Sequence, residues 1–155
     1  MRRKTLNRNS DYSQGYFNPN VREKYRGSWP IIYRSSLELK VYRWMDNNSK
    51  IVSWGSESVV IPYKSPVDNK IHRYFVDLAV HFKDEKTNSI KKYLIEIKPF
   101  KFTLPPTVTA RKSHKTILYE HHQYSVNSAK WEAAKLWCSK NGYTFIILTE
   151  KKINI

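Results

Sequence analysis

The sequence predicts an α/β fold in which helices flank a central mixed sheet. Helical and strand-like segments follow one another in the order helix, strand, strand, strand, helix, strand. Two of the strands are separated only by the polar segment KDEKTNS, so this pair is antiparallel and a Rossmann domain is excluded. The length of 155 residues is typical of one domain, which we place at residues 34–155 behind an N-terminal arm, residues 1–33.

The N-terminal arm shows neither a helical nor a strand period. Its aromatic side chains alternate with basic ones, among them Arg22, Lys24 and Arg26. This interleaving suits a nucleic acid, because basic groups bind phosphates and aromatic rings stack on bases. Alternatively, the aromatic rings pack on the domain that follows. Both interpretations are open at this point, and the first makes these three basic residues DNA-binding candidates.

The first half of the domain predicts one helix and three strands. Apolar side chains recur at helical spacing over residues 35–48, which predicts an amphipathic helix (Leu37, Val41, Trp44, Met45). Residues 50–63 are rich in β-branched and aromatic side chains and predict one strand with an irregularity at Gly55. The same composition predicts strands at residues 73–82 and 90–100.

The second half begins with an irregular segment. Residues 100–125 contain Pro105 and Pro106 and a basic, histidine-containing run, which predicts a long excursion or a partly helical insertion. A second helix is expected over residues 125–141, followed directly by Gly142. Its predicted apolar stripe consists of Ala129, Ala133, Leu136 and Trp137. Residues 144–149 are expected to form a short buried strand.

The charge distribution indicates the class of partner. The chain has 28 Lys and Arg residues against 13 Asp and Glu residues, a formal net charge of +15. The excess lies in residues 1–43 and 98–135, and the second range includes the basic cluster Arg111, Lys112 and Lys115. Such an excess favours a polyanion, with nucleic acid as the first candidate and an anionic membrane surface as the second.

Other compositional features exclude several protein classes. No apolar run is long enough to span a membrane, and no apolar stretch follows the basic N-terminus as in a secretory signal. The single cysteine, Cys138, excludes a disulfide framework and a cysteine-based zinc cluster. We therefore expect a soluble intracellular protein.

Two acidic residues in neighbouring strands are candidates for chemistry. A hairpin that pairs Phe82 with Lys91 also places Asp77 opposite Glu96, with Lys98 two residues further along. Two adjacent buried carboxylates repel each other unless a proton or a cation lies between them. Oxygen ligands without cysteine or clustered histidine favour Mg²⁺ or Mn²⁺. A lysine beside them can orient a water nucleophile or stabilise charge on a phosphate.

A structural interpretation of these residues is also open. Glu96 and Lys98 can be exposed residues of an edge strand, with Asp77 paired with Arg73 or with a turn amide. Glu38 is ambiguous in the same way. It can point inward over the sheet as a third carboxylate, or it can complete the capping-box pattern that begins at Ser35.

Together these residues resemble the motifs of the PD-(D/E)XK nuclease superfamily. The motifs are Glu38 in LELKVY, Asp77 in RYFVDLAVHF and Glu96-Ile97-Lys98 in YLIEIKP. More narrowly, the runs YRSSLELKVYRWMD, YFVDLAV and YLIEIKPF are similar to TnsA-type transposon endonucleases, and the basic arm and compact length resemble the head-completion nucleases of T-even-type tailed phages. The resemblance implies a restriction-endonuclease-like αβββαβ core. Val76 replaces the proline that usually precedes the first acid, which leaves the chemistry intact.

The resemblance also implies a role for each residue. Asp77, Glu96 and the backbone carbonyl of Ile97 would bind Mg²⁺ or Mn²⁺. Lys98 would position the attacking water or stabilise the pentavalent phosphate, and Glu38 would serve a second metal or hold a metal-bound water. Lys130 is the candidate polar residue on the second helix.

The implied function is Mg²⁺-dependent cleavage of double-stranded DNA during phage head completion, before tail joining. The implied partners are head, portal or neck proteins, in the host cytoplasm during assembly or in the virion. No membrane partner is implied. One alternative is a non-catalytic DNA-binding structural protein of the head or neck, and another is a transposon-type subunit that cleaves DNA ends.

Overall fold

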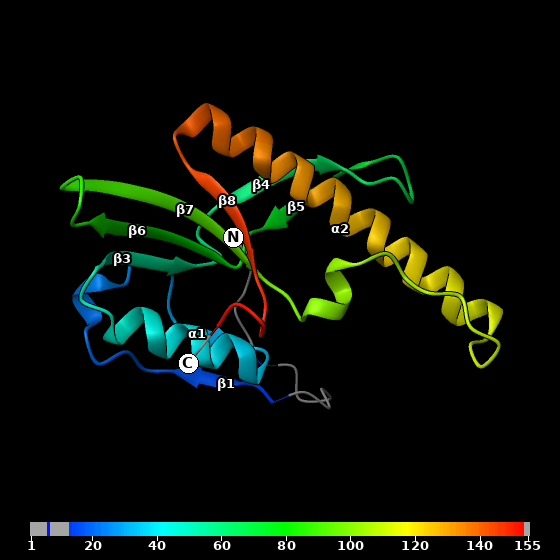
Figure 1. Ribbon diagram of the computed structural model, residues 1–155, viewed down its shortest axis with the longest axis horizontal. Coiled ribbons are helices and arrows are strands. Elements are labelled where there is room, and N and C mark those ends of the chain that lie inside the picture. The colour runs from blue at the N-terminus through cyan, green and yellow to red at the C-terminus, as the bar shows by residue number, and fades with distance from the viewer. Residues whose placement is uncertain (1–5, 7–12, 154–155) are drawn as a thin grey trace.

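The computed structural model describes residue 6 and residues 13–153. Figure 1 shows the two long helices and the sheet between them. The elements, in chain order, are β1 (Gly15–Phe17), η1 (Arg22–Lys24), β2 (Ile31–Tyr33), α1 (Ser36–Asn47), β3 (Ile51–Ser56), β4 (Val60–Lys64), β5 (Ile71–Phe75), β6 (Leu78–Asp84), β7 (Ser89–Ile97), η2 (Phe100–Thr103), α2 (His114–Asn141) and β8 (Thr144–Leu148). Among the described residues, neither helix combines the length and apolar character that a bilayer-spanning helix needs.

The central sheet is mixed, as predicted, with the strand order β3-β6-β7-β8. β3, β6 and β7 are antiparallel neighbours, whereas β8 runs parallel to β7 because the chain returns to the sheet through α2. Alternating side chains divide the core between the helices: Ile95 packs on the α1 side, and Leu94 packs on the α2 side. The predicted hairpin register is confirmed, since Phe82 pairs with Lys91.

Two of the predicted strands are each divided by a bend. The predicted strand 50–63 forms β3 and β4, and the predicted strand 73–82 lies across β5 and β6. β3 pairs with β6 in the main sheet, whereas β4 and β5 form a separate two-stranded sheet. The prediction of continuous strands is wrong because Ile61 of β4 and Tyr74 of β5 are buried in the core beneath α2, which requires both strands to leave the main sheet.

Part of the N-terminal arm belongs to the folded domain. β1 and β2 form a small antiparallel sheet, and Phe17, Tyr25 and Ile31 are buried in the core beneath α1. The buried Asp46 near the end of α1 accepts hydrogen bonds from the N–H groups of Asn20 (2.6 Å) and Val21 (3.1 Å). From residue 13 onward the arm therefore packs on the domain. Residues 1–5 and 7–12 lie outside the described residues, and the domain boundary at residue 33 stays a prediction.

Helix α2 begins earlier than predicted, at His114 instead of residue 125. The Ser113 side chain accepts a hydrogen bond from the Thr116 N–H, which caps the new start. At the other end, Gly142 has the predicted left-handed conformation, with a φ of 72°. The predicted apolar stripe is partly wrong: Leu136 is 58% exposed, and the buried apolar residues of the helix are Trp131, Ala134 and Cys138.

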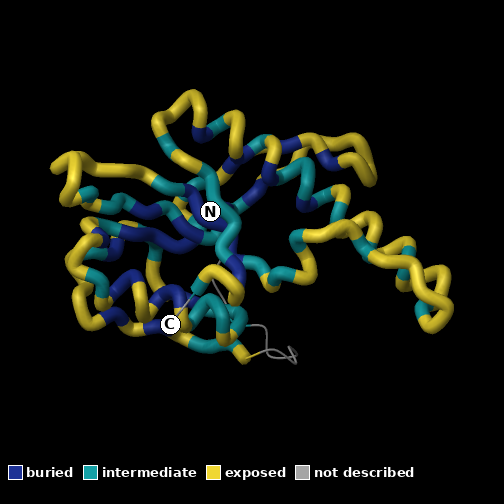
Figure 2. The backbone as a smooth tube through the Cα atoms, viewed as in Figure 1, coloured by how far each residue is buried: buried dark blue, intermediate teal, exposed yellow. Residues whose placement is uncertain are grey.

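The early start of α2 produces a projection from the body of the protein. Residues 104–123, which we call the extension, consist of a loop and the first part of α2, and they reach away from the sheet (Figures 1 and 2). Its exposed side chains include Val108, Leu118 and Tyr119. The predicted excursion is therefore real, but most of its second half is a regular helix.

Candidate active site

Asp77 lies at the bend between β5 and β6 and not within a strand. Its main-chain carbonyl accepts a hydrogen bond from the Glu57 N–H at 3.1 Å. Its carboxylate oxygen Oδ2 accepts a hydrogen bond from the Ile97 N–H at 2.7 Å. The Asp77 carboxylate therefore reaches across to the end of β7, where Glu96 and Lys98 lie.

Glu96 occupies the end of β7 and is only 5% exposed. Its Oε2 accepts a hydrogen bond of 2.6 Å from the hydroxyl group of Tyr74. Its Oε1 is 3.5 Å from Nζ of Lys98, whose side chain is 27% exposed. The interpretation of Glu96 as an exposed edge residue is therefore wrong, because β8 covers this side of β7. Asp77 does accept a hydrogen bond from a main-chain amide, as the structural interpretation proposed, but that amide belongs to Ile97, the residue after Glu96.

The electrostatics show that the carboxylates share one site. Burial raises the pKa of the Asp77 carboxyl well above its ordinary range, and the charges of Glu96 and Glu38 raise it further. The Ile97 hydrogen bond and the Lys98 charge act in the opposite direction but are smaller effects. The site thus favours either a proton or a cation between its carboxylates.

Glu38 makes hydrogen bonds at the start of α1, and its role as a third site carboxylate stays a prediction. Its N–H donates to the Ser35 hydroxyl at 3.1 Å, and its Oε2 accepts a hydrogen bond of 2.6 Å from the Arg34 N–H. It therefore caps α1 from its third position. Burial also raises the pKa of Glu38, while the Arg34 contacts lower it and the charges of Glu57 and Glu96 raise it. The capping carboxylate consequently faces the same acidic centre.

Sequence patterns missed two residues of this site. Glu57 lies at the bend after β3, has a positive φ of 51°, and repels Glu38 electrostatically. Tyr74 lies in the run predicted as a strand at residues 73–82, and its hydroxyl group donates a hydrogen bond to Glu96. The tyrosine itself was the available signal, because a buried hydroxyl group needs a polar partner.

The donor set fits a hard divalent cation. Oδ2 of Asp77 accepts from the Ile97 amide and Oε2 of Glu96 accepts from Tyr74, so an ion would approach Oδ1 of Asp77 and Oε1 of Glu96, the second of which also lies 3.5 Å from Nζ of Lys98. In the described part of the chain, no three His, Cys, Asp or Glu side chains are grouped as a preformed cation site. Two carboxylates are nevertheless sufficient for Mg²⁺, which keeps several water ligands and binds substrate phosphates.

The predicted DNA-binding residues of the N-terminal segment make internal contacts. Nζ of Lys24 donates to the main-chain carbonyls of Asp46 (3.1 Å) and Asn48 (2.8 Å), at the end of α1. Arg26 donates to the carbonyl of Glu23, and the Arg22 guanidinium lies 4.7 Å from the ring centre of Trp29. These contacts hold the segment together, and DNA binding by these residues stays a prediction.

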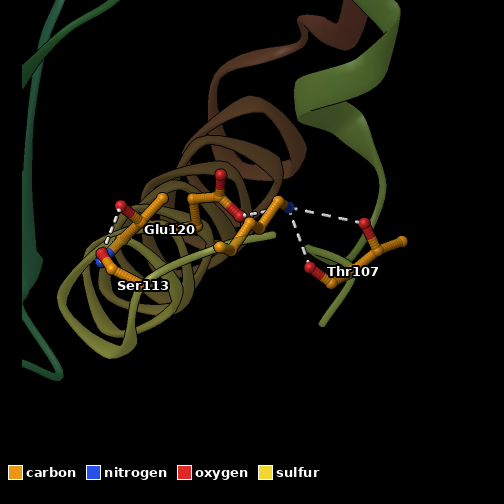
Figure 3. Close-up of polar contacts among 5 residues, drawn as sticks. Thr107, Ser113 and Glu120 are labelled. Carbon is orange, nitrogen blue, oxygen red and sulfur yellow. Dashed lines mark hydrogen bonds and ion pairs between the residues drawn. The ribbon is translucent and has the colours of Figure 1, made fainter. Parts of the chain in front are cut away.

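The basic cluster lies on the extension, away from the carboxylates. Nζ of Lys112 donates to the carbonyl of Thr107 and to the carboxylate of Glu120, both at 2.8 Å (Figure 3). Lys112 thus fastens the loop to α2, whereas Arg111 and Lys115 are exposed. Lys130 lies further along α2, where its Nζ is 5.5 Å from the ring centre of Tyr74. Lys130 is therefore close to Tyr74, which contacts Glu96, and it does not belong to the basic cluster.

Comparisons with known proteins agree with this geometry. Residues 48–150 match the family described as TnsA-like endonuclease N terminal, a range that contains Asp77, Glu96 and Lys98. The head completion nuclease of Enterobacteria phage T4 is 40% identical over 143 residues, which cover 90% of this chain and 91% of that protein. The αβββαβ core fits the restriction-endonuclease-like fold expected of such a domain. The chain therefore belongs to the TnsA-like endonuclease family.

Proposed function

We propose that the chain is an Mg²⁺-dependent endodeoxyribonuclease with Asp77, Glu96 and Lys98 as its catalytic residues. The most direct support is the buried pair of carboxylates beside a lysine ammonium, at the meeting point of the bend and the end of β7. Burying like charges destabilises a fold unless a cation or proton neutralises them. A purely structural domain gains nothing from such a pair, which disfavours the non-catalytic alternative.

Each group has a distinct part in the proposed reaction. Asp77 and Glu96, with the Ile97 carbonyl, would hold the ion, which supplies a positive charge to the scissile phosphate and a more acidic water molecule. Lys98, beside Glu96 Oε1, orients the attacking water or stabilises the negative charge that develops on the phosphate. Glu38, fixed by its cap contacts, adds a negative charge on the α1 side and positions a water molecule or a second ion.

The relative in phage T4, which is named a head completion nuclease, supports a proposal for the biological setting. We propose that this chain likewise processes double-stranded DNA at the filled head before tail joining, in contact with head, portal or neck proteins. The host cytoplasm is then its site of action during assembly. The family match alone is equally compatible with a subunit that cleaves transposon ends. The 40% identity to the phage protein, over about nine-tenths of both chains, favours the phage role.

The DNA is proposed to contact the basic residues of the extension as well as the catalytic centre. Arg111 and Lys115 are exposed there, and Lys112 stabilises the loop on which Arg111 lies. Phosphate contacts of this kind give affinity without sequence preference. The extension would therefore hold the duplex while the carboxylate centre cuts it.

A plasmid-nicking experiment tests the proposed activity. Supercoiled DNA is incubated with Mg²⁺ or with EDTA and with the parent protein, Asp77→Asn or Lys98→Met. The parent should nick only with Mg²⁺, and both variants should fail. Asp68→Asn is the matched control, because Asp68 is an exposed carboxylate hydrogen-bonded to His72 in the β4–β5 turn; it should nick like the parent. Equal nicking by all four proteins would indicate a contaminant and overturn the assignment.

A further inference from the structure

The contacts of Tyr74 set it apart from the other buried aromatic residues. It lies on β5 and is 3% exposed, and its hydroxyl group donates a 2.6 Å hydrogen bond to Oε2 of Glu96. The two residues are 22 positions apart in the sequence and belong to different sheets. This hydrogen bond therefore links the small β4–β5 sheet directly to the acidic centre.

The hydrogen bond determines which oxygen of Glu96 is available. With Oε2 bound to Tyr74, Oε1 is the oxygen that lies near Lys98. Asp77 is fixed in the same manner, since its Oδ2 is bound by the Ile97 amide. Each carboxylate thus has one oxygen fixed by a hydrogen bond, and a cation would approach the other oxygen, which in Glu96 also lies beside the Lys98 ammonium group.

Tyr74 is also well suited to remain a donor. A phenol hydroxyl group can donate one hydrogen bond, and this one is directed at Oε2 of Glu96 at 2.6 Å. Nζ of Lys130 lies 5.5 Å from the centre of its ring. The ring is buried with Val76 and Trp131 in the core beneath α2, which restricts its rotation.

We propose that Tyr74 is a positioning residue, which fixes the Glu96 carboxylate so that Oε1 and Asp77 Oδ1 together receive the divalent cation. This inference rests on the proposed metal-dependent function of the site. Groups that hydrogen-bond to metal ligands fix their orientation, and replacing such groups weakens metal binding by about 10–100-fold. Tyr74 acts through Glu96 and is not itself a ligand.

The test measures Mn²⁺ affinity without DNA, together with the Mg²⁺ dependence of nicking, for the parent and Tyr74→Phe. The variant should bind Mn²⁺ about 10–100-fold more weakly and need correspondingly more Mg²⁺ for half-maximal nicking, while the rate at saturating Mg²⁺ stays close to that of the parent. Tyr63→Phe is the control, because Tyr63 is a buried tyrosine of the neighbouring strand β4 in the same core cluster. It should bind Mn²⁺ like the parent.

A double-substitution cycle separates positioning from general damage to the core. Once Glu96 is changed to Gln, adding Tyr74→Phe should weaken Mn²⁺ binding much less than it does in the parent, because the contact is already altered. Equal weakening in both backgrounds would overturn the inference. So would unchanged Mn²⁺ affinity in Tyr74→Phe while the parent nicks DNA, an outcome that leaves the proposed function intact. A parent that binds no Mn²⁺ would overturn the metal site and this inference together.

A measurement on the unsubstituted protein covers the case in which Tyr74→Phe does not fold. The buried Tyr74 hydroxyl proton should give a downfield, slowly exchanging NMR resonance that moves in Glu96→Gln. Failure of that resonance to appear or to respond to Glu96→Gln would contradict the contact on which the inference depends.

Discussion

The carboxylate centre and the extension use charge in opposite ways. At the centre, Glu96 is 5% exposed, and Glu96 and Asp77 are each fixed by a hydrogen bond from another strand. On the extension, Tyr119 is 64% exposed, and Arg111 and Lys115 are exposed as well. Buried charges in a fixed geometry suit the chemical step, because low polarity strengthens their interactions. Exposed charges suit the capture of a long phosphate backbone.

Substitution at the centre should slow cleavage strongly and leave DNA binding in place. Lys98→Met is expected to lower the nicking rate on the order of 10²–10³-fold, because it removes the group that stabilises developing charge. Affinity for duplex DNA, measured by fluorescence anisotropy, should change by less than about threefold, since one phosphate contact at most is lost. A parallel loss of affinity and rate would mean that the centre and the extension are not separate in function.

Substitution on the extension should have the opposite effect. Arg111→Gln with Lys115→Gln is expected to weaken duplex binding and to reduce the slope of log affinity against log salt by about 2, with the rate at saturating DNA preserved. The control is Lys83→Gln with Lys86→Gln, an equal charge change in exposed residues of the β6–β7 hairpin. An equal effect of both pairs would show that net charge, and not the extension, determines DNA binding.

The acidic centre should also lower stability when no cation is present. The pKa of Asp77 is raised above its ordinary value of 3.8, so the folded protein binds the proton more tightly than the unfolded chain does. The stabilisation from this proton is therefore complete below pH 3.8 and is lost as pH rises through the raised pKa. In EDTA at neutral pH, Asp77→Asn should increase the free energy of unfolding by about 1–2 kcal/mol.

Denaturant unfolding of the parent and Asp77→Asn across this pH range measures the effect. The difference between the two proteins should grow with pH above 3.8, and added Mg²⁺ should reduce it by stabilising the parent alone. A parent more stable than Asp77→Asn in EDTA at neutral pH would contradict the repulsion inferred at the site.

The smallest expected effect concerns the contact that fastens the extension. Lys112→Met removes the hydrogen bonds to Thr107 and Glu120 (Figure 3), an exposed network that should contribute less than about 1 kcal/mol. Amide hydrogen exchange should become faster in residues 107–120 and stay unchanged in β7. Faster exchange in β7 would show that the extension and the sheet unfold as one unit.

Local sequence patterns were sufficient for the main sheet and for the register of its hairpin. The alternation in β6 and β7 and the length of their turn predicted that register, but the pairing ends at Leu78 and Ile95, and Asp77 reaches the end of β7 from a bend instead of from a paired strand position. Local sequence patterns did not predict the bends after β3 and before β6, because those bends depend on the packing of Ile61 and Tyr74 beneath α2. Tyr74 and Glu57 were missed for the same reason, since both reach the centre only once the strands have bent.

The length of α2 shows a second limit. The run from His114 to Tyr124 lacks a clear apolar stripe because this part of the helix projects from the body, and several of its side chains, such as Leu118, face solvent. Periodicity reports a helix only where one face is buried. The start at His114 instead depends on local capping by Ser113 and on the Lys112 contacts.

Paramagnetic NMR with Mn²⁺ tests most directly whether Asp77 and Glu96 receive a divalent cation. In a ¹⁵N-labelled protein, substoichiometric Mn²⁺ should first broaden the amide resonances of Asp77, Glu96, Ile97 and Lys98, and Asp77→Asn should abolish this broadening. Broadening centred instead on the exposed Asp68–His72 pair, or unchanged by Asp77→Asn, would contradict the account.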